Sequence, residues 1–152
     1  PAPLRPPRAP DLPAAPLDEV ITSIEKRVTD AANTQIDAFA INEALATIWE
    51  LVDALNGYIT EQEPWALAKD PSTRGQLETV LATTVHGLGT LAVLHAPVLP
   101  KATARLWSAL GGAGALEDQR IDRAWEVVTG ARVSALEASL FPRIETAEEQ
   151  SA

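Results

Sequence analysis

"IDAFAINEALATIWELVDALNGYITE", residues 36–61, is the stretch that decides the fold. Its apolar side chains recur every three or four residues, which is the spacing of one face of an α-helix. They are Phe39, Ala40, Leu45, Ile48, Trp49, Val52, Leu55 and Ile59. Gly57 disfavours a helix interior by about 1 kcal/mol, so we expect the last turn to bend or fray. The stretch predicts one long helix that Pro64 ends.

Helical spacing also appears on both sides of this stretch. Upstream, residues 16–33 read "PLDEVITSIEKRVTDAAN" and open with two acidic residues that suit the helix dipole. Downstream, an apolar seam over residues 77–94 predicts a third helix, with Ser72 or Thr73 as its cap. The prolines within residues 97–100 end that helix.

Glycines mark the second half of the predicted bundle. Gly87 and Gly89, inside the third helix, either allow another helix to approach closely or weaken this helix. A short fourth helix follows in "KATARLWSALGG", residues 101–112, which Gly111 closes. Its inward side chains are expected to be Leu106, Trp107 and Leu110. The next stretch, residues 111–118, is rich in glycine and predicts a loop.

From Arg120 onward the helical signal weakens. The segment predicts short extended pieces that wrap the bundle, anchored by Trp125, Val127, Leu140 and Phe141. The expected fold class is therefore all-α: a helical bundle of about four main helices with an extended C-terminal strap.

Three regions follow from this pattern. Residues 1–16 are a proline-rich linker or arm, since prolines lack the backbone donors that a helix uses. Residues 17–145 form the bundle, and residues 146–152 are a polar tail. Arg5 and Arg8 in the arm could grip a neighbour, although a solvated linker is the simpler interpretation.

Composition and charge exclude several classes of function. The chain has 152 residues, no cysteine and a formal net charge of −9. The lack of cysteine rules out disulfides and thiolate metal sites, and the acidic charge disfavours non-specific binding to nucleic acid or to anionic membranes. No apolar run reaches the roughly 20 residues of a membrane span, and the N-terminal stretch lacks the apolar region of a secretory signal. We therefore expect no membrane partner.

No motif for catalysis or for metal binding stands out. The two histidines, His86 and His95, are nine residues apart, so they share no helix face and are interpreted as structural. Phosphate-binding loops and nucleophile motifs are absent from the sequence, and "GGAGA", residues 111–115, is a loop. We expect no catalytic residue, no metal site and no cofactor in this chain.

The tryptophans divide into two kinds. Trp49, Trp107 and Trp125 fall on apolar stripes and are expected in the core. Trp65 follows Pro64 at a corner, outside any stripe. It either covers the end of the bundle as a hydrophobic staple or offers its indole to a partner. A base stacked on an exposed aromatic ring gains about 1–3 kcal/mol, and this needs no positive net charge.

Residues 43–70, "EALATIWELVDALNGYITEQEPWALAKD", followed by "LETVL", "APVLP" and finally "LFPRIE", carry a resemblance. The chain resembles the C-terminal anticodon-binding domain of bacterial methionyl-tRNA synthetase, a class I aminoacyl-tRNA synthetase, over residues 36–145. The most specific part is N-x-Y-x-x-x-x-x-P-W-x-L-A-K at residues 56–69. Any one of these motifs alone would be weak, and together they are specific.

The resemblance implies a role for the corner. In the family, the tryptophan packs against an anticodon base and the proline fixes its placement; these roles fall on Trp65 and Pro64. Lys69 and Arg74, next to the corner, are candidate contacts to the tRNA backbone, with ordinary solvated charges as the alternative. Arg143 is expected to contact the bundle or the catalytic domain.

The resemblance also implies partners outside the chain. These are the anticodon loop of tRNA(Met) and the catalytic domain of the same synthetase, which would use ATP and Mg²⁺ in the cytoplasm. Family members also read the anticodon with an Asn-x-x-x-Arg pair on a preceding helix, and no such pair stands before residue 17. The alternative function is a helical protein-interaction module without nucleic-acid binding. An independent enzyme is the weakest reading.

Overall fold

The computed structural model describes residues 15–130 and 132–144. Most of the predicted arm and the whole predicted tail lie outside these residues. The described part is helical throughout its first two thirds, as the sequence predicts. Its elements are α1 (Glu19–Asp37), α2 (Ile41–Gln62), α3 (Pro64–Leu67), η1 (Pro71–Thr73), α4 (Arg74–His95), α5 (Pro100–Ala109), η2 (Leu116–Asp118) and η3 (Ile121–Glu126), where η marks a 3₁₀ helix.

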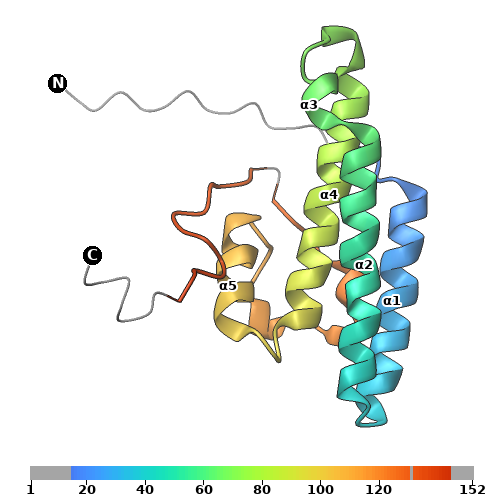
Figure 1. The fold of residues 1–152 in the computed structure, drawn as a ribbon, viewed down its shortest axis with the longest axis vertical. Helices are drawn as coiled ribbons and strands as arrows, with labels where there is room; N and C mark the ends of the chain where they lie inside the picture. The colour runs from blue at the N-terminus through green and yellow to red at the C-terminus, as the bar shows by residue number, and fades with distance from the viewer. Residues whose placement is uncertain (1–14, 131, 145–152) are drawn as a thin grey trace, which may run out of the picture.

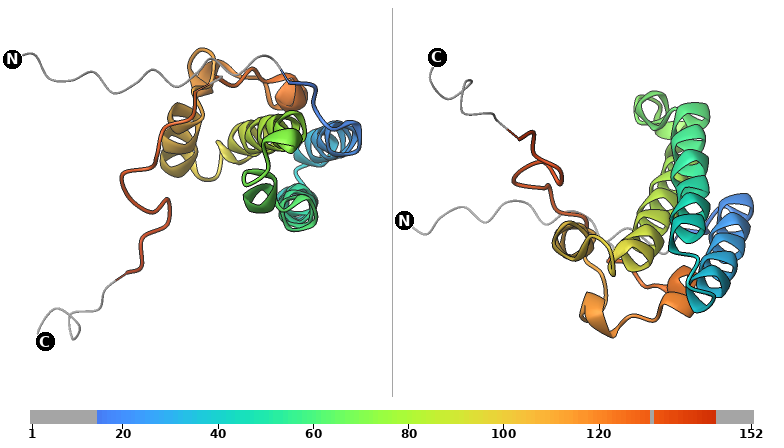
Figure 2. Two further views of the ribbon diagram at one scale, coloured as in Figure 1. Left: turned by 90° about the horizontal axis from the view of Figure 1, so that it is seen from above. Right: turned by 60° about the horizontal axis from the view of Figure 1, so that its bottom comes forward.

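Three long helices make the body of the molecule. Helices α1, α2 and α4 run up and down beside one another, and the short α3 sits at one end of the bundle (Figure 1). Helix α5 packs against α4, and η3 lies against both α1 and α4 (Figure 2). The all-α bundle that the sequence predicts is confirmed, with α3 as a fifth, single-turn helix at the corner.

The first helix starts and ends with well-formed caps. The Asp18 carboxylate accepts hydrogen bonds from the backbone N–H groups of Val20 and Ile21, at 2.9 and 3.2 Å. At the other end, the Phe39 N–H donates to the Ile36 carbonyl and the Ala40 N–H to the Gln35 carbonyl, at 2.9 and 2.8 Å. This pair of bonds is a Schellman motif, which requires a left-handed residue just past the helix.

Phe39 occupies that left-handed position, with φ of 58°. Glycine or asparagine is usual there, and a bulky L-residue costs roughly 1–2 kcal/mol. Phe39 is 90% exposed, so the prediction that it packs on the second helix's apolar stripe is wrong. The apolar residues keep a helical spacing from Ile36 onward, through the turn at which the chain reverses between α1 and α2. Periodicity alone therefore does not reveal this turn.

The second helix continues past its glycine. Helix α2 runs through Gly57 to Gln62, and nothing lies within 4 Å of the position that a Gly57 Cβ would take. The expected fraying of the last turn is therefore not seen. Glu63, with φ of 46°, ends α2 in the left-handed region, and the chain turns into α3 at that point.

Glycines bring the long helices together at α4. A Cβ on Gly87 would lie 2.7 Å from a δ-carbon of Leu55 and 3.1 Å from a carboxylate oxygen of Glu25. A Cβ on Gly89 would meet the Thr129 side chain at 2.7 Å. The predicted close approach is confirmed, although at Gly89 the neighbour is the segment after η3 and not a helix.

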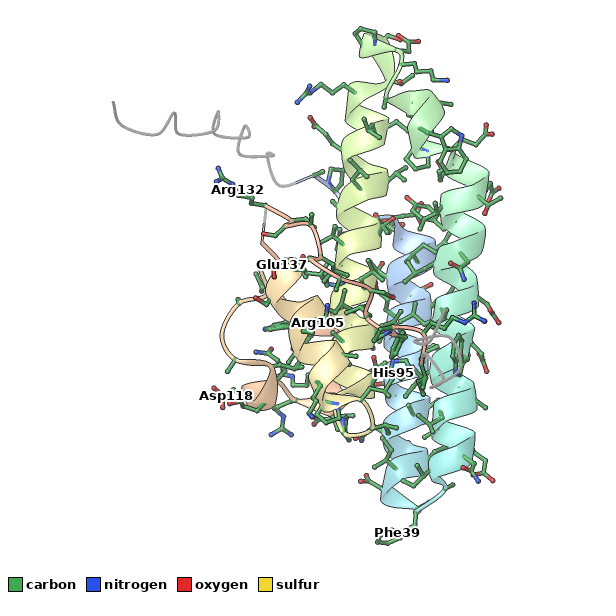
Figure 3. The ribbon with its side chains drawn as sticks, turned by 60° about the vertical axis from the view of Figure 1, so that its left-hand side comes forward. Phe39, His95, Arg105, Asp118, Arg132 and Glu137 are labelled. Atoms are coloured by element: carbon green, nitrogen blue, oxygen red, sulfur yellow. The ribbon has the colours of Figure 1, made fainter. Side chains whose placement is uncertain are left out.

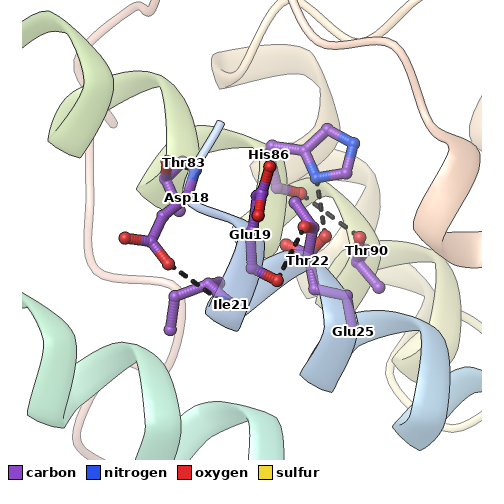
Figure 4. A network of polar contacts seen from close by, with 8 residues as sticks. All are labelled: Asp18, Glu19, Ile21, Thr22, Glu25, Thr83, His86 and Thr90. Atoms are coloured by element: carbon purple, nitrogen blue, oxygen red, sulfur yellow. Dashed lines mark hydrogen bonds and ion pairs between the residues drawn. The ribbon is translucent and has the colours of Figure 1, made fainter. Parts of the chain in front are cut away.

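The core is mostly aliphatic but includes a buried polar pair between α1 and α4. Glu25 of α1 is 0% exposed, and its Oε2 lies 2.8 Å from Nδ1 of His86 on α4 (Figure 4). The Thr83 hydroxyl beside them accepts a hydrogen bond from the Asp18 N–H at 2.9 Å. His95 Nδ1 lies 3.0 Å from the carbonyl of Leu91. Both histidines thus have intramolecular partners, in keeping with their structural interpretation.

The tryptophans correct part of the predicted core. Trp107 is buried at 4% exposure, as expected. Trp125 is half-buried beneath the Lys26 ammonium, which lies 5.6 Å from the ring centroid. Trp49 is 58% exposed, so its predicted place in the core is wrong. Ile48 takes the core-facing position, and Trp49 lies about 100° further around the helix.

The predicted C-terminal strap is not confirmed. Val127 is buried at 7% exposure, but Phe141 is 65% exposed and is not the anchor that the sequence suggested. The Arg105 guanidinium holds the later segment by donating to the carbonyls of Ala138 and Ser139, at 2.9 and 3.2 Å. These two bonds tie the segment around residues 138–139 to α5.

One helix is apolar enough to span a membrane by length and composition. Among the described residues, this helix covers residues 71–95, and an 18-residue window within it has a mean hydropathy of 1.4, with 50% of that window buried inside the bundle. From the sequence, no apolar run of that length is expected. A core helix passes the same test, and the burial of α4 between its neighbours accounts for its composition.

Candidate nucleic-acid interface

The corner between α2 and α4 presents an indole to solvent. Pro64 stands at the first position of α3, where its fixed φ suits a helix start and its missing N–H costs nothing. Trp65 follows on the same turn and is 55% exposed. About half of this side chain is therefore accessible, so Trp65 does not act as a fully buried staple.

Side-chain hydrogen bonds hold the segment that connects α3 to α4. The Thr73 hydroxyl lies 2.8 Å from the carbonyl oxygens of both Leu67 and Asp70. The Asp70 carboxylate accepts from the Ser72 N–H at 2.9 Å. Asp70, and not Ser72 or Thr73, therefore provides the side-chain cap at this start, which corrects the sequence expectation. The hydrogen bond from Ser72 also lowers the pKa of the Asp70 carboxyl below its usual value.

The two long helices are also linked beside the corner. The Gln76 side-chain amide, in the first turns of α4, donates to the Gln62 side chain at the end of α2 across 3.4 Å. This long bond adds little energy, but it joins the helix that enters the corner to the helix that leaves it. With the Thr73 and Asp70 bonds, it makes the corner a short braced loop.

The charges around the corner are mixed. Lys69 is exposed and lies four residues beyond Trp65. Arg74 is also exposed, but its Nε lies 2.9 Å from a carboxylate oxygen of Glu78, one helical turn away. Glu61 and Glu63 are exposed on the approach to the corner. Of the two predicted cations, Arg74 thus already has an acidic neighbour that balances its charge.

Two further predictions concern Arg143 and metal binding. Arg143 is exposed in the segment after α5. No cluster of three or more histidine, cysteine or acidic side chains able to hold a metal ion is found in residues 15–130 and 132–144.

Sequence reasoning missed the residues that brace the corner. Thr73, Asp70, Gln62 and Gln76 were not recognised as one bonded set, although "DPST", residues 70–73, carries the signal of an aspartate cap before a proline. The link between Gln62 and Gln76 has no local signal because it joins two helices.

Fold and corner together define a helical binding domain: an all-α frame with an accessible aromatic side chain at a braced turn. A family model described as "Anticodon binding domain of methionyl tRNA ligase" matches residues 12–152. The chain therefore belongs to the family of anticodon-binding domains of methionyl-tRNA ligases.

Individual relatives agree with this assignment. The chain is 35% identical over 147 residues to a methionine–tRNA ligase of Streptomyces coelicolor, covering 89% of this chain and 27% of that protein. It is 32% identical over 138 residues to that of Bacillus subtilis, covering 87% of this chain and 20% of that protein. The chain thus spans about a quarter or less of the length of these relatives.

Solved structures share the fold. The apo crystal structure of Mycobacterium tuberculosis methionyl-tRNA synthetase superimposes with a TM-score of 0.72 at 24% identity, covering 93% of this chain and 28% of that chain. The form bound by methionyl-adenylate gives a TM-score of 0.71 at 23% identity, over 84% of this chain and 26% of that one.

Proposed function

We propose that this domain reads the anticodon of tRNA(Met) for a methionine–tRNA ligase, with Trp65 stacked on an anticodon base. The observation that carries the proposal is the accessible indole of Trp65, 55% exposed at the start of a one-turn helix. An indole face is a good stacking platform for any base and is worth about 1–3 kcal/mol per stacked base.

Pro64 supports this by fixing the direction of α3. Its ring locks φ, and Glu63 before it sits in a left-handed conformation that sets the angle between α2 and α3. The Thr73 hydroxyl then holds the carbonyl end of α3. Because the backbone of the turn is held on both sides, it need not be ordered at the moment of binding, which lowers the entropic cost of association.

Cations near the corner would add the electrostatic part of binding. We propose Lys69 as the main contact to the tRNA backbone. Arg74 contributes less, since its guanidinium already faces the carboxylate of Glu78 at 2.9 Å. With a formal net charge of −9, the chain offers a local contact and not a continuous basic groove.

The rest of the reaction belongs to the ligase that carries such a domain. We propose that this ligase charges tRNA(Met) in the cytoplasm, using ATP and Mg²⁺ in a catalytic domain outside this chain. The domain contributes by holding the anticodon. A protein-interaction module without nucleic-acid binding is not favoured, because the family match and the relatives all point to tRNA ligases.

The test compares two exposed tryptophans. Trp65→Ala and Trp49→Ala each remove an indole that is more than half exposed, at 55% and 58%. We expect Trp65→Ala to weaken binding of tRNA(Met) about tenfold, the equivalent of about 1.4 kcal/mol. Trp49→Ala should leave affinity nearly unchanged. Binding is measured by gel shift at low and moderate salt, with melting curves for each variant.

Two results would count against the proposal. One is a Trp65→Ala variant that melts many degrees lower with tRNA affinity intact, since that describes a structural staple. The other is recovery of a protein partner with no retardation of tRNA at either salt concentration.

A further inference from the structure

The turn between α1 and α2 carries the most exposed aromatic side chain among the described residues. Phe39 is 90% exposed and lies at the extreme end of the bundle, directed away from the helices (Figure 3). Ile41 beside it is 44% exposed, and Ala38 is exposed as well. Residues 38–41 therefore form a small apolar tip.

Folding of the described residues does not explain a phenylalanine at this tip. The Schellman motif requires a left-handed residue at position 39, and glycine or asparagine meets that requirement without strain. Phe39 adopts φ of 58° and gains almost no burial in return. A strained, exposed apolar residue points to a contact outside the chain.

The tip lies at the opposite end of α2 from the proposed reading corner. Helix α2 has 22 residues between them, which corresponds to about 33 Å. An anticodon bound at Trp65 therefore leaves the tip free to face another part of the ligase. The matched relatives are large enough to supply that part, since the chain covers only 27% of the Streptomyces coelicolor ligase and 20% of the Bacillus subtilis ligase.

Charge distinguishes the kind of partner. Asp37 and Glu43 flank the tip and are both exposed. Two carboxylates beside an apolar centre disfavour contact with a phosphate backbone and favour a protein surface with an apolar hollow and a basic rim.

We propose that residues 38–41 dock, with Phe39 at the centre, on the catalytic part of the same methionine–tRNA ligase. This contact sets the direction in which the Trp65 corner points. The inference rests on the proposed function, because that function makes the Phe39 end the one that faces away from the anticodon.

The test uses the full-length ligase and three variants of one residue. Phe39→Asn and Phe39→Gly fit the left-handed turn but lack the apolar side chain, whereas Phe39→Leu keeps an apolar side chain. Hydrogen exchange is followed by mass spectrometry over the whole ligase. We expect at least one peptide of the catalytic part to exchange about tenfold faster in Phe39→Asn and Phe39→Gly, and at the wild-type rate in Phe39→Leu.

Three results would overturn the proposal. The first is identical exchange of the catalytic part in all four proteins. The second is a loss of tRNA affinity in Phe39→Asn without any change in that exchange, which would assign the tip to RNA. The third is a change from dimer to monomer in sedimentation without such a change, which would assign the tip to a second copy. Trp65→Ala, measured separately, reports on the proposed function and leaves this exchange unaffected.

Discussion

The two turns that flank α2 look alike in the backbone and differ in how they are held. Each contains a non-glycine residue at positive φ, Phe39 at 58° and Glu63 at 46°, and each presents an exposed aromatic side chain. The Phe39 turn is held by the two backbone bonds of the helix end, from Phe39 N–H to the Ile36 carbonyl and from Ala40 N–H to the Gln35 carbonyl. At the Trp65 corner, Thr73 and Asp70 add side-chain bonds that hold the turn from outside.

This difference teaches how exposure relates to function. An exposed ring on an unbraced tip can adapt to a protein surface. An exposed ring on a braced corner stands on backbone that is already positioned, so a flat ligand can stack on it with a smaller loss of backbone freedom. Both turns are held in place by the packing of α1, α2 and α4. Loss of that packing would therefore affect both turns.

The largest effect is expected from breaking the buried pair in the frame. His86→Ala leaves the Glu25 carboxylate, 0% exposed, without its partner at 2.8 Å. Removing one member of a buried pair costs about 3–5 kcal/mol of stability. Urea unfolding should therefore show a much lower midpoint. The double variant Glu25→Leu with His86→Leu should recover most of the loss, and equal instability of the single and double variants would contradict this reading.

The next effect concerns the brace at the Trp65 corner. Thr73→Val removes the hydroxyl that bonds to the carbonyls of Leu67 and Asp70. We expect a loss of about 1 kcal/mol of stability. We also expect a several-fold weaker binding of tRNA(Met), because the backbone that carries Trp65 is held less firmly. Ser72→Ala keeps the Thr73 hydroxyl and serves as control. Unchanged tRNA affinity in Thr73→Val would mean that the brace does not position Trp65.

A smaller effect on the unfolding free energy is expected from replacing the left-handed residue of each turn by glycine. Phe39→Gly and Glu63→Gly each remove the backbone strain of a side-chain-bearing residue in the left-handed region. The relief of roughly 1–2 kcal/mol is partly offset by the roughly 0.5–1 kcal/mol entropic cost of glycine. Each should therefore raise the unfolding free energy of the 152-residue chain by about 1 kcal/mol or less in denaturant titrations. A clear loss of stability in Phe39→Gly would show that the ring packs within the chain.

The smallest effect is the pH dependence of the corner cap. The hydrogen bond from the Ser72 N–H lowers the folded-state pKa of Asp70. A depressed carboxyl pKa stabilises the fold above the unfolded-state value of about 4, and this contribution is lost as the pH falls through the folded-state pKa. The melting difference between the wild type and Asp70→Ala should thus shrink below about pH 4. A difference that stays constant down to pH 2 would contradict the role of the ionised cap.

Much of the fold was accessible from the sequence because periodicity records which face of a helix is buried. The seams of α2 and α4, the close approach at Gly87 and Gly89, and the buried Trp107 all carry that signal. The corner was recognised because a proline and a tryptophan interrupt the pattern. Periodicity failed where apolar spacing continues through a reversal, at Phe39, and where a tryptophan lies on the edge of a stripe, at Trp49.

Two of the contacts that the sequence did not reveal join residues distant in the chain. Glu25 lies between the apolar residues of α1, but its pairing with His86 depends on how two helices meet. The link from Gln76 to Gln62 across the corner is of the same kind. Such contacts follow from the three-dimensional arrangement, and no local spacing specifies them.

The central claim is that the Trp65 indole stacks on a base of the anticodon. A double-mutant cycle tests it most directly, combining Trp65→Ala with RNA stem-loops in which one base of the CAU triplet is replaced by an abasic nucleotide. Affinities are measured with the ligase that carries this domain. We predict a coupling of about 1–3 kcal/mol between the Trp65 side chain and one of the three positions. Additive effects at all three positions would contradict the claim.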